Sequence, residues 1–183
     1  MNALLGITDF LLHVLLTLYV YALMIRMLLG LTRADFYNPF SQSILTVTNP
    51  ALRPLHKWIP HTGRLDTAAL LLMVAVKFAE LALRGLLVGR AAETGTLFLA
   101  AVFGVIDLAL NLYIFAIFAL VAISWLAPHL HGQSNPLVSV LNSITAPLLA
   151  PVRRMIPRVG VFDFSTAAVL LALFSAKIFL HSL

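Results

Sequence analysis

Four long apolar runs dominate this 183-residue chain and leave few folds open to it. They extend over residues 7–31, 66–89, 97–127 and 163–182, and only a few ionisable residues interrupt each run. A helix rises about 1.5 Å per residue, so about 20 residues cross the roughly 30 Å of hydrocarbon in a bilayer. A water-soluble domain of this size cannot bury a chain that is 61% hydrophobic and 10% charged. The sequence therefore predicts an all-α integral membrane protein with four transmembrane helices.

The remaining composition limits the chemistry and the partners. The absence of cysteine excludes disulfides, thiolate metal sites and cysteine nucleophiles. The sequence also lacks the motifs of nucleotide-binding loops, zinc proteases and serine hydrolases, so we expect neither enzymatic activity nor a metal or cofactor. Lys and Arg outnumber Asp and Glu by 12 to 7, and these cations lie beside the apolar runs. Membrane orientation explains them better than a direct nucleic-acid partner, which we do not expect.

A stretch of 29 residues occurs twice in the chain. Residues 38–66 (NPFSQSILTVTNPALRPLHKWIPHTGRLD) and 135–163 (NPLVSVLNSITAPLLAPVRRMIPRVGVFD) align without a gap at a constant offset of 97, with ten identical positions. Self-similarity of this kind indicates an internal duplication. It divides the chain into a first repeat, 1–90, and a second repeat, 97–183, each with two spans around one copy. An even number of spans separates the copies, so the repeats should be parallel about a pseudo-two-fold axis along the membrane normal.

Each copy is expected to form a hairpin of two short amphipathic helices. Asn-Pro is typical of an N-cap followed by the first helical residue, and the apolar residues Phe40, Ile44 and Val47 follow at helical spacing. A second proline begins the second short helix, a later proline ends it, and an Asp caps the next span. The residues that define this hairpin motif are Asn38, Pro39, Pro50, Pro54, Pro60 and Asp66, and then Asn135, Pro136, Pro147, Pro151, Arg153, Arg154, Pro157 and Asp163.

The distribution of Lys and Arg predicts how the chain is oriented. Both hairpins are basic, with Arg153 and Arg154 in the second copy, so the positive-inside rule places the hairpins in the cytoplasm and both termini in the periplasm. Cations at a helix end also suit anionic lipid headgroups as partners. Two placements of the hairpins stay open. Each is either an anchor that lies in the membrane interface or a re-entrant element that frames a pathway with its counterpart.

Ionisable residues within the spans are costly and therefore mark candidate sites. Glu80 and Lys177 are equivalent under the 97-residue offset, while Arg26 lies near a span end, where it can reach headgroups. Three acids and three bases make up an expected polar network in the outer half of the membrane, namely Asp9, Lys77, Glu80, Arg84, Asp107 and Lys177. Such a network either holds the four helices together, with Lys77 and Glu80 paired within one helix, or forms an ion or proton path.

The second copy and its flanks (ISWLAP…NPLVSVLNSITAPLLAPVRRMIP…FDFSTAAVLL), together with the duplicated four-span plan, carry a resemblance that covers most of the chain. The sequence resembles the YggT family of small bacterial membrane proteins, which is related to the YlmG proteins of Gram-positive bacteria, cyanobacteria and plastids. The first copy departs from the pattern, since His56 and Lys57 stand where the second copy has two arginines.

This resemblance implies a protein of the bacterial inner membrane linked to osmotic tolerance or ion homeostasis, and in relatives to cell division, nucleoid organisation or photosynthetic cytochrome assembly. Two functions are therefore expected. The protein serves osmotic and ion homeostasis by conducting or modulating a flux, or it is a scaffold or assembly factor whose hairpins recruit partners or anionic lipid. The identity of any protein partner and the oligomeric state stay open.

Overall fold

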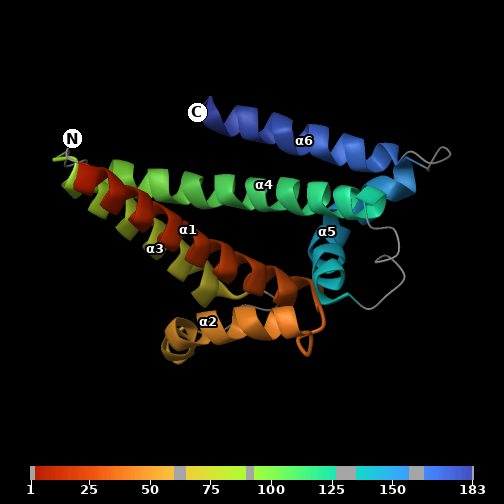
Figure 1. Ribbon diagram of the computed structural model, residues 1–183, viewed down its shortest axis with the longest axis horizontal. Coiled ribbons are helices and arrows are strands. Elements are labelled where there is room, and N and C mark those ends of the chain that lie inside the picture. Colours follow the sequence, from red (N-terminus) through yellow and green to blue (C-terminus); the bar gives the residue numbers. More distant parts are fainter. Residues whose placement is uncertain (1–2, 60–64, 90–92, 127–134, 157–162, 183) are drawn as a thin grey trace. The chain divides into compact units, whose positions relative to one another are not determined.

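The computed structural model describes residues 3–59, 65–89, 93–126, 135–156 and 163–182 (Figure 1). Within these ranges the chain forms six helices, so the predicted all-α class is confirmed. The helices are α1 (Ala3–Thr32), α2 (Pro39–Leu55), α3 (Thr67–Leu87), α4 (Thr94–Leu126), α5 (Pro136–Met155) and α6 (Phe164–His181). The roles predicted for Pro60 and Pro157 fall outside the described residues.

Each of the four predicted spans coincides with one helix, namely α1, α3, α4 or α6. In the described residues, α1, α4 and α6 are long and apolar enough to cross a membrane. The helix α3 is also long, with 21 residues, but it contains more charged residues than α1, α4 and α6. Every 18-residue window of α3 contains the three charged residues Lys77, Glu80 and Arg84. If α3 crosses a membrane, other groups of the protein must therefore pair with these three charged side chains.

The chain divides into two compact units, of which the first contains residues Met1–Met27 and Ile44–Leu108. In this unit α1 and α3 run antiparallel, because Asp9 near the start of α1 contacts Arg84 near the end of α3 (Figure 1). Arg26 of α1 donates through Nη1 to Thr48 Oγ1 (3.0 Å) and Asn49 Oδ1 (2.6 Å) of α2. Arg26 thus positions α2, which differs from the headgroup contact predicted for it.

The second unit contains residues Leu28–Ser43 and Ala109–Leu183. Its apolar core joins the second half of α4 to α5 and α6 through Ile117, Leu149, Val169 and Leu173. The rings of Phe118 and Phe174 add an edge-to-face contact at 6.5 Å between α4 and α6. Helices α4 and α6 run antiparallel in this unit (Figure 1).

The predicted hairpins of two short helices are wrong for both copies, because α2 and α5 are each one continuous helix. Pro50 and Pro54 lie inside α2, and Pro147 and Pro151 lie inside α5. An internal proline removes one backbone hydrogen bond and bends a helix away from its ring. All four prolines are exposed, and each pair is spaced by four residues, so both rings share one face. Leu52 and Leu149 are buried between the two prolines of their pairs, so the buried face continues through this part of each helix.

The buried stripe on these helices agrees only in part with the predicted apolar face. In the second copy that face consists of Leu137, Leu141 and Ile144, of which Leu141 and Ile144 are buried, whereas Leu137 and, in the first copy, Val47 are exposed. Further buried positions repeat at the 97-residue offset, as Ser41, Thr48 and Leu52 in α2 and Val138, Thr145 and Leu149 in α5. The hydroxyls of Thr48 and Thr145 donate to the carbonyls four residues earlier, Ile44 O (2.7 Å) and Leu141 O (2.8 Å). Because the helix itself satisfies these hydroxyls, threonine can occupy a buried stripe.

The predicted N-caps are confirmed at both copies. Asn38 Oδ1 accepts from Phe40 N, and Asn135 Oδ1 accepts from Leu137 N at 3.0 Å. The Nδ2 of Asn38 also donates to Pro136 O (2.7 Å), so the beginnings of α2 and α5 meet in the second unit.

Each of the two capping Asp residues has a second partner, and these two partners occupy equivalent positions in the two copies. Asp66 caps α3 by accepting from Ala69 N, and its Oδ1 lies 2.9 Å from His56 Nε2. Asp163 caps α6 and accepts from Arg153 Nη2 at 3.1 Å. In both copies, therefore, the first residue of the basic pair holds the Asp that begins the next long helix.

The cap at Asp163 predicts a pH dependence of stability. Burial alone would raise the pKa of Asp163, but hydrogen bonds from Ser165 and Thr166 and the charge of Arg153 outweigh burial and lower this pKa from 3.8 to about 2. A pKa that is lower in the folded than in the unfolded state stabilises the folded protein at pH values above the unfolded-state pKa. This contribution is lost as the pH falls through the folded-state pKa of about 2. Its size is on the order of 2 kcal/mol.

We expect Asp163→Asn, which can still cap α6, to lose this contribution. Thermal unfolding of wild type and variant in nanodiscs between pH 5 and 2 measures the difference, which should shrink toward the acidic end. Glu93→Gln, at an exposed carboxylate, is the matched control and should keep the wild-type pH profile. A constant difference between wild type and Asp163→Asn across this range would contradict the prediction.

Candidate functional site

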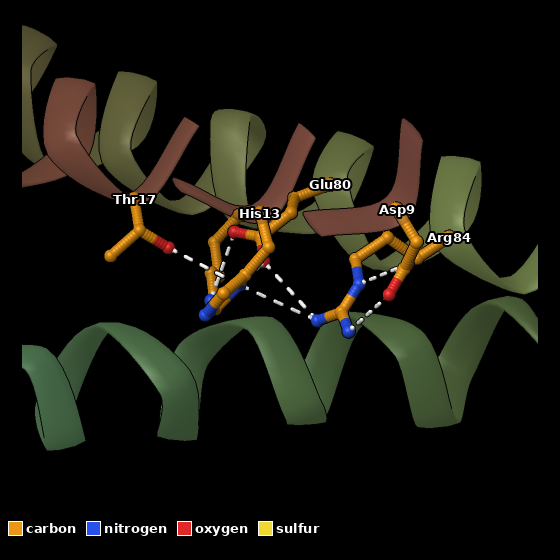
Figure 2. A network of polar contacts seen from close by, with 6 residues as sticks. Asp9, His13, Thr17, Glu80 and Arg84 are labelled. Atoms are coloured by element: carbon orange, nitrogen blue, oxygen red, sulfur yellow. Dashed lines mark hydrogen bonds and ion pairs between the residues drawn. The ribbon is translucent and has the colours of Figure 1, made fainter. Parts of the chain in front are cut away.

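Two polar stripes face each other in the first unit, one on α1 and one on α3. Their residues recur at helical spacing, four apart on α1 and three or four apart on α3, so each set lies on one face of its helix. Figure 2 shows the labelled side chains projecting from the two helices into one shared space. We call this set the α1–α3 polar cluster, and its members are Asp9, His13, Thr17, Lys77, Glu80 and Arg84.

Glu80 is the centre of the cluster and has no solvent-exposed surface. Its Oε2 accepts from Lys77 Nζ at 2.9 Å, which confirms the predicted pairing within one helix. Its Oε1 lies 2.7 Å from His13 Nδ1 and 3.6 Å from Arg84 Nη1. A buried carboxylate is tolerated only where charges and donors replace its hydration. Here side chains of both helices supply them.

Arg84 joins the second carboxylate to the cluster. Its Nε donates to Asp9 Oδ1 (2.7 Å) and its Nη2 donates to Asp9 Oδ2 (3.1 Å), a two-pronged geometry that orients both side chains. The cluster therefore contains two acidic side chains, Asp9 and Glu80, and two basic ones, Lys77 and Arg84. Pairing of opposite charges offsets part of the cost of removing them from water.

His13 connects the buried carboxylate to the surface. Nδ1 lies 2.7 Å from Glu80 Oε1, so in the tautomer with a hydrogen on Nδ1 that hydrogen is donated to the carboxylate. Nε2 is then the acceptor nitrogen. Thr17 Oγ1 and Arg84 Nη1 lie farther from Nδ1, at 3.5 and 3.4 Å. The His13 side chain is 45% exposed, so it connects the buried Glu80 carboxylate to the surface of the first unit.

A glycine of α4 makes room for the lysine of the cluster. A methyl group placed on Gly104 would lie 3.0 Å from Lys77 Cε and 3.3 Å from Lys77 Cγ. These contacts are tighter than ordinary van der Waals packing, so the lysine stem passes directly over the α4 backbone. Gly104 therefore helps to set the path along which Lys77 reaches Glu80.

The structure brings together four of the six residues predicted for the network, Asp9, Lys77, Glu80 and Arg84. Asp107 lies in the half of α4 that belongs to the same unit and is half-buried. Lys177 lies in the second unit, where its Nζ donates to Asn111 Oδ1 at 2.5 Å. Glu80 and Lys177, which lie 97 residues apart, thus contact different helices, α1 through His13 and α4 through Asn111.

Sequence reasoning left His13, Thr17 and Asn111 out of the expected network. A signal for His13 and Thr17 exists in the sequence, because they follow Asp9 at intervals of four and extend its face of α1. Asn111 has no such signal, since it stands alone in an apolar helix. Within the described ranges, no three His, Asp or Glu residues are grouped so that they could hold a metal ion.

Substitution at Gly104 tests the packing of the cluster. We expect Gly104→Ala to displace Lys77 and to lower the free energy of unfolding by roughly 1 to 3 kcal/mol, the usual cost of an added methyl group in a packed site. Thermal unfolding in nanodiscs measures the change. Gly95→Ala is the control, because it adds the same methyl group to α4 at a position with nothing within 4 Å. Equal effects of both substitutions would contradict the packing assigned to Gly104.

Comparison with known proteins gives a consistent assignment over both halves of the chain. A family model described as CCB3/YggT matches residues 5–87 and again residues 99–183. An uncharacterized protein of Pseudomonas aeruginosa, PA0392, is 36% identical over 166 residues, which cover 90% of this chain and 83% of that protein. The YggT protein of Escherichia coli (strain K12), also named as uncharacterized, is 32% identical over 167 residues, or 91% of this chain and 85% of its own length. No solved structure matches the chain.

Proposed function

The chain belongs to the CCB3/YggT family, and we propose that it is a non-enzymatic protein of the bacterial inner membrane that serves osmotic and ion homeostasis. The α1–α3 polar cluster is its working site in this proposal. One observation carries it, namely that a carboxylate without solvent exposure, Glu80, lies 2.7 Å from a histidine that is half-exposed. Ionisable groups in that arrangement at membrane depth are typical of sites that move protons or ions.

The proposed topology has four spans in two parallel repeats, with both termini in the periplasm. The family model supports the two repeats, because it matches each half of the chain once. The pairing of Lys77 with Glu80 and of Arg84 with Asp9 supports α3 as the fourth span, since it compensates the charges that set α3 apart. Exposed aromatic residues at helix ends on the proposed cytoplasmic side, Tyr37, Trp58 and Trp125, agree with an interfacial belt there.

The chain lacks cysteine, so single introduced cysteines can test this topology without background labelling. Lys57→Cys and Glu93→Cys flank α3 at exposed positions. In intact cells we expect a membrane-impermeant maleimide to label Glu93→Cys, and to label Lys57→Cys only after permeabilisation, because α3 crosses the membrane between them. Equal labelling of both positions in intact cells would show that α3 does not cross.

The proposed transfer step uses the tautomers of His13. A proton that arrives at Nε2 produces an imidazolium, and the Nδ1 proton can then pass to the Glu80 carboxylate 2.7 Å away. His13 is left neutral with its hydrogen on Nε2, and Glu80 is left as a carboxylic acid. Protonation of Glu80 removes the counterion of Lys77, so Lys77 favours return of Glu80 to the carboxylate. The reverse sequence returns the proton to Nε2, so a net flux requires Glu80 to release its proton toward the opposite face.

We expect purified protein in liposomes to dissipate a pH gradient, and Glu80→Gln to slow this flux at least about tenfold because the proton acceptor is lost. A pH-sensitive dye inside the vesicles, with potassium and valinomycin to set the potential, measures the rate. Lys77→Met combined with Glu80→Gln keeps the site neutral and separates lost transfer from lost folding. Glu93→Gln, which alters an exposed carboxylate, should keep the wild-type rate, and Lys177→Met shows whether the second repeat contributes.

A wild-type rate in the neutral double variant would rule out Glu80 as the transfer group. No flux of protons or cations under any gradient would remove the transport role altogether. The alternative function, a membrane scaffold or assembly factor, would then be favoured. That alternative rests on exposed apolar residues along α2, such as Val47 and Tyr37 just before it, which offer a surface to a protein partner.

A further inference from the structure

The two members of each basic pair have different roles. The first member, His56 or Arg153, contacts the acidic cap of the next helix, at 2.9 and 3.1 Å. The second member, Lys57 or Arg154, is exposed. These positions are equivalent under the 97-residue offset, so the division occurs in both copies. In the first copy His56 is half-buried and Lys57 is exposed; in the second copy both arginines are exposed, and Arg153 is the one that contacts the Asp163 cap.

A large, exposed apolar side chain follows the second cation in both copies. Trp58 is 86% exposed and Met155 is 82% exposed. A cation next to a large apolar side chain is the combination that suits the boundary between lipid headgroups and acyl chains. Both sites also lie where a long helix begins, since Asp66 starts α3 and Asp163 starts α6. Each site is therefore at the depth where a span would enter the bilayer.

We propose that Lys57 with Trp58, and Arg154 with Met155, form two equivalent binding sites for anionic phospholipid headgroups. The cation binds the phosphate of the headgroup, while Trp58 or Met155 inserts beside the upper acyl chain. Charge complementarity favours an anionic lipid over a zwitterionic one, because Lys57 and Arg154 are exposed cations, whereas His56 and Arg153 contact the carboxylates of Asp66 and Asp163. This inference concerns the membrane surface and does not depend on ion flux through the polar cluster.

Fluorescence of Trp58 tests the first site in the full chain. The variant Trp125→Phe leaves Trp58 as the reporter, since the chain has two tryptophans. The protein is placed in vesicles of phosphatidylcholine and phosphatidylglycerol, with bromine on one lipid or the other as the quencher. We expect phosphatidylglycerol to be favoured next to Trp58 by about fivefold, the contribution of one cation near an anionic surface. Lys57→Gln should bring this preference close to one.

Matched variants separate the two roles of the basic pair. For the second site, Met155→Trp is the reporter in a chain that also carries Trp58→Phe and Trp125→Phe. Arg154→Gln should abolish the preference for phosphatidylglycerol and leave thermal stability unchanged. Arg153→Gln should lower thermal stability through loss of the Asp163 contact and leave the lipid preference unchanged. Arg33→Gln, which removes an exposed arginine elsewhere, should change neither quantity.

Equal quenching by the two brominated lipids while Lys57 and Arg154 are present would overturn the proposal. So would a preference that survives Lys57→Gln or Arg154→Gln, since another part of the surface would then attract the lipid. If Arg153→Gln abolished the preference for phosphatidylglycerol and left thermal stability unchanged, Arg153 would be the lipid-binding residue. That result would overturn the different roles assigned to Arg153 and Arg154.

Discussion

Glu80 has no solvent-exposed surface, so charged and hydrogen-bonding groups of the protein must replace the water around its carboxylate. The packing of the first unit depends on this interaction. The contact of Glu80 with His13 sets the faces on which α1 and α3 meet, and the neighbouring pair of Asp9 and Arg84 sets their antiparallel register. Its contact with Lys77 extends the requirement to α4, where the lysine stem passes over Gly104. Three helices are thus arranged around one buried charge, and the apolar residues beside it complete the packing.

Comparison of the two copies separates what the duplicated plan requires from what each copy adds. Both have an Asn cap, a buried threonine that donates within its helix, and a basic residue bonded to the Asp that begins the next long helix. These features form the helices and join them end to end. The residues inside the long helices differ, because Lys177 stands at the position equivalent to Glu80 and Leu110 at the position equivalent to His13. The residues that the two copies share therefore account for the helix caps and for the contacts between successive helices, whereas the polar cluster belongs to the first copy.

The sequence allowed prediction of features that depend on local periodicity and capping. Helices coincide with all four apolar runs, the Asn and Asp caps form as predicted, and Lys77 pairs with Glu80 within one helix. The continuity of α2 and α5 could not be predicted from prolines alone. A proline normally ends or bends a helix, and the outcome depends on which face carries it. The pairs spaced by four share an exposed face, and that is visible only once the buried stripe is known.

The partners of the charged residues were less predictable, because tertiary packing decides which stripes meet. Arg26 near a span end had the pattern of a headgroup contact but binds Thr48 and Asn49 of α2. This contact and His13 are both on α1, about 20 Å apart along the helix axis. The second copy has Ile123 where the first has Arg26, so α4 offers neither group at the equivalent positions. Helix α1 therefore joins α2 to the polar cluster through Arg26 at one end and His13 and Asp9 at the other.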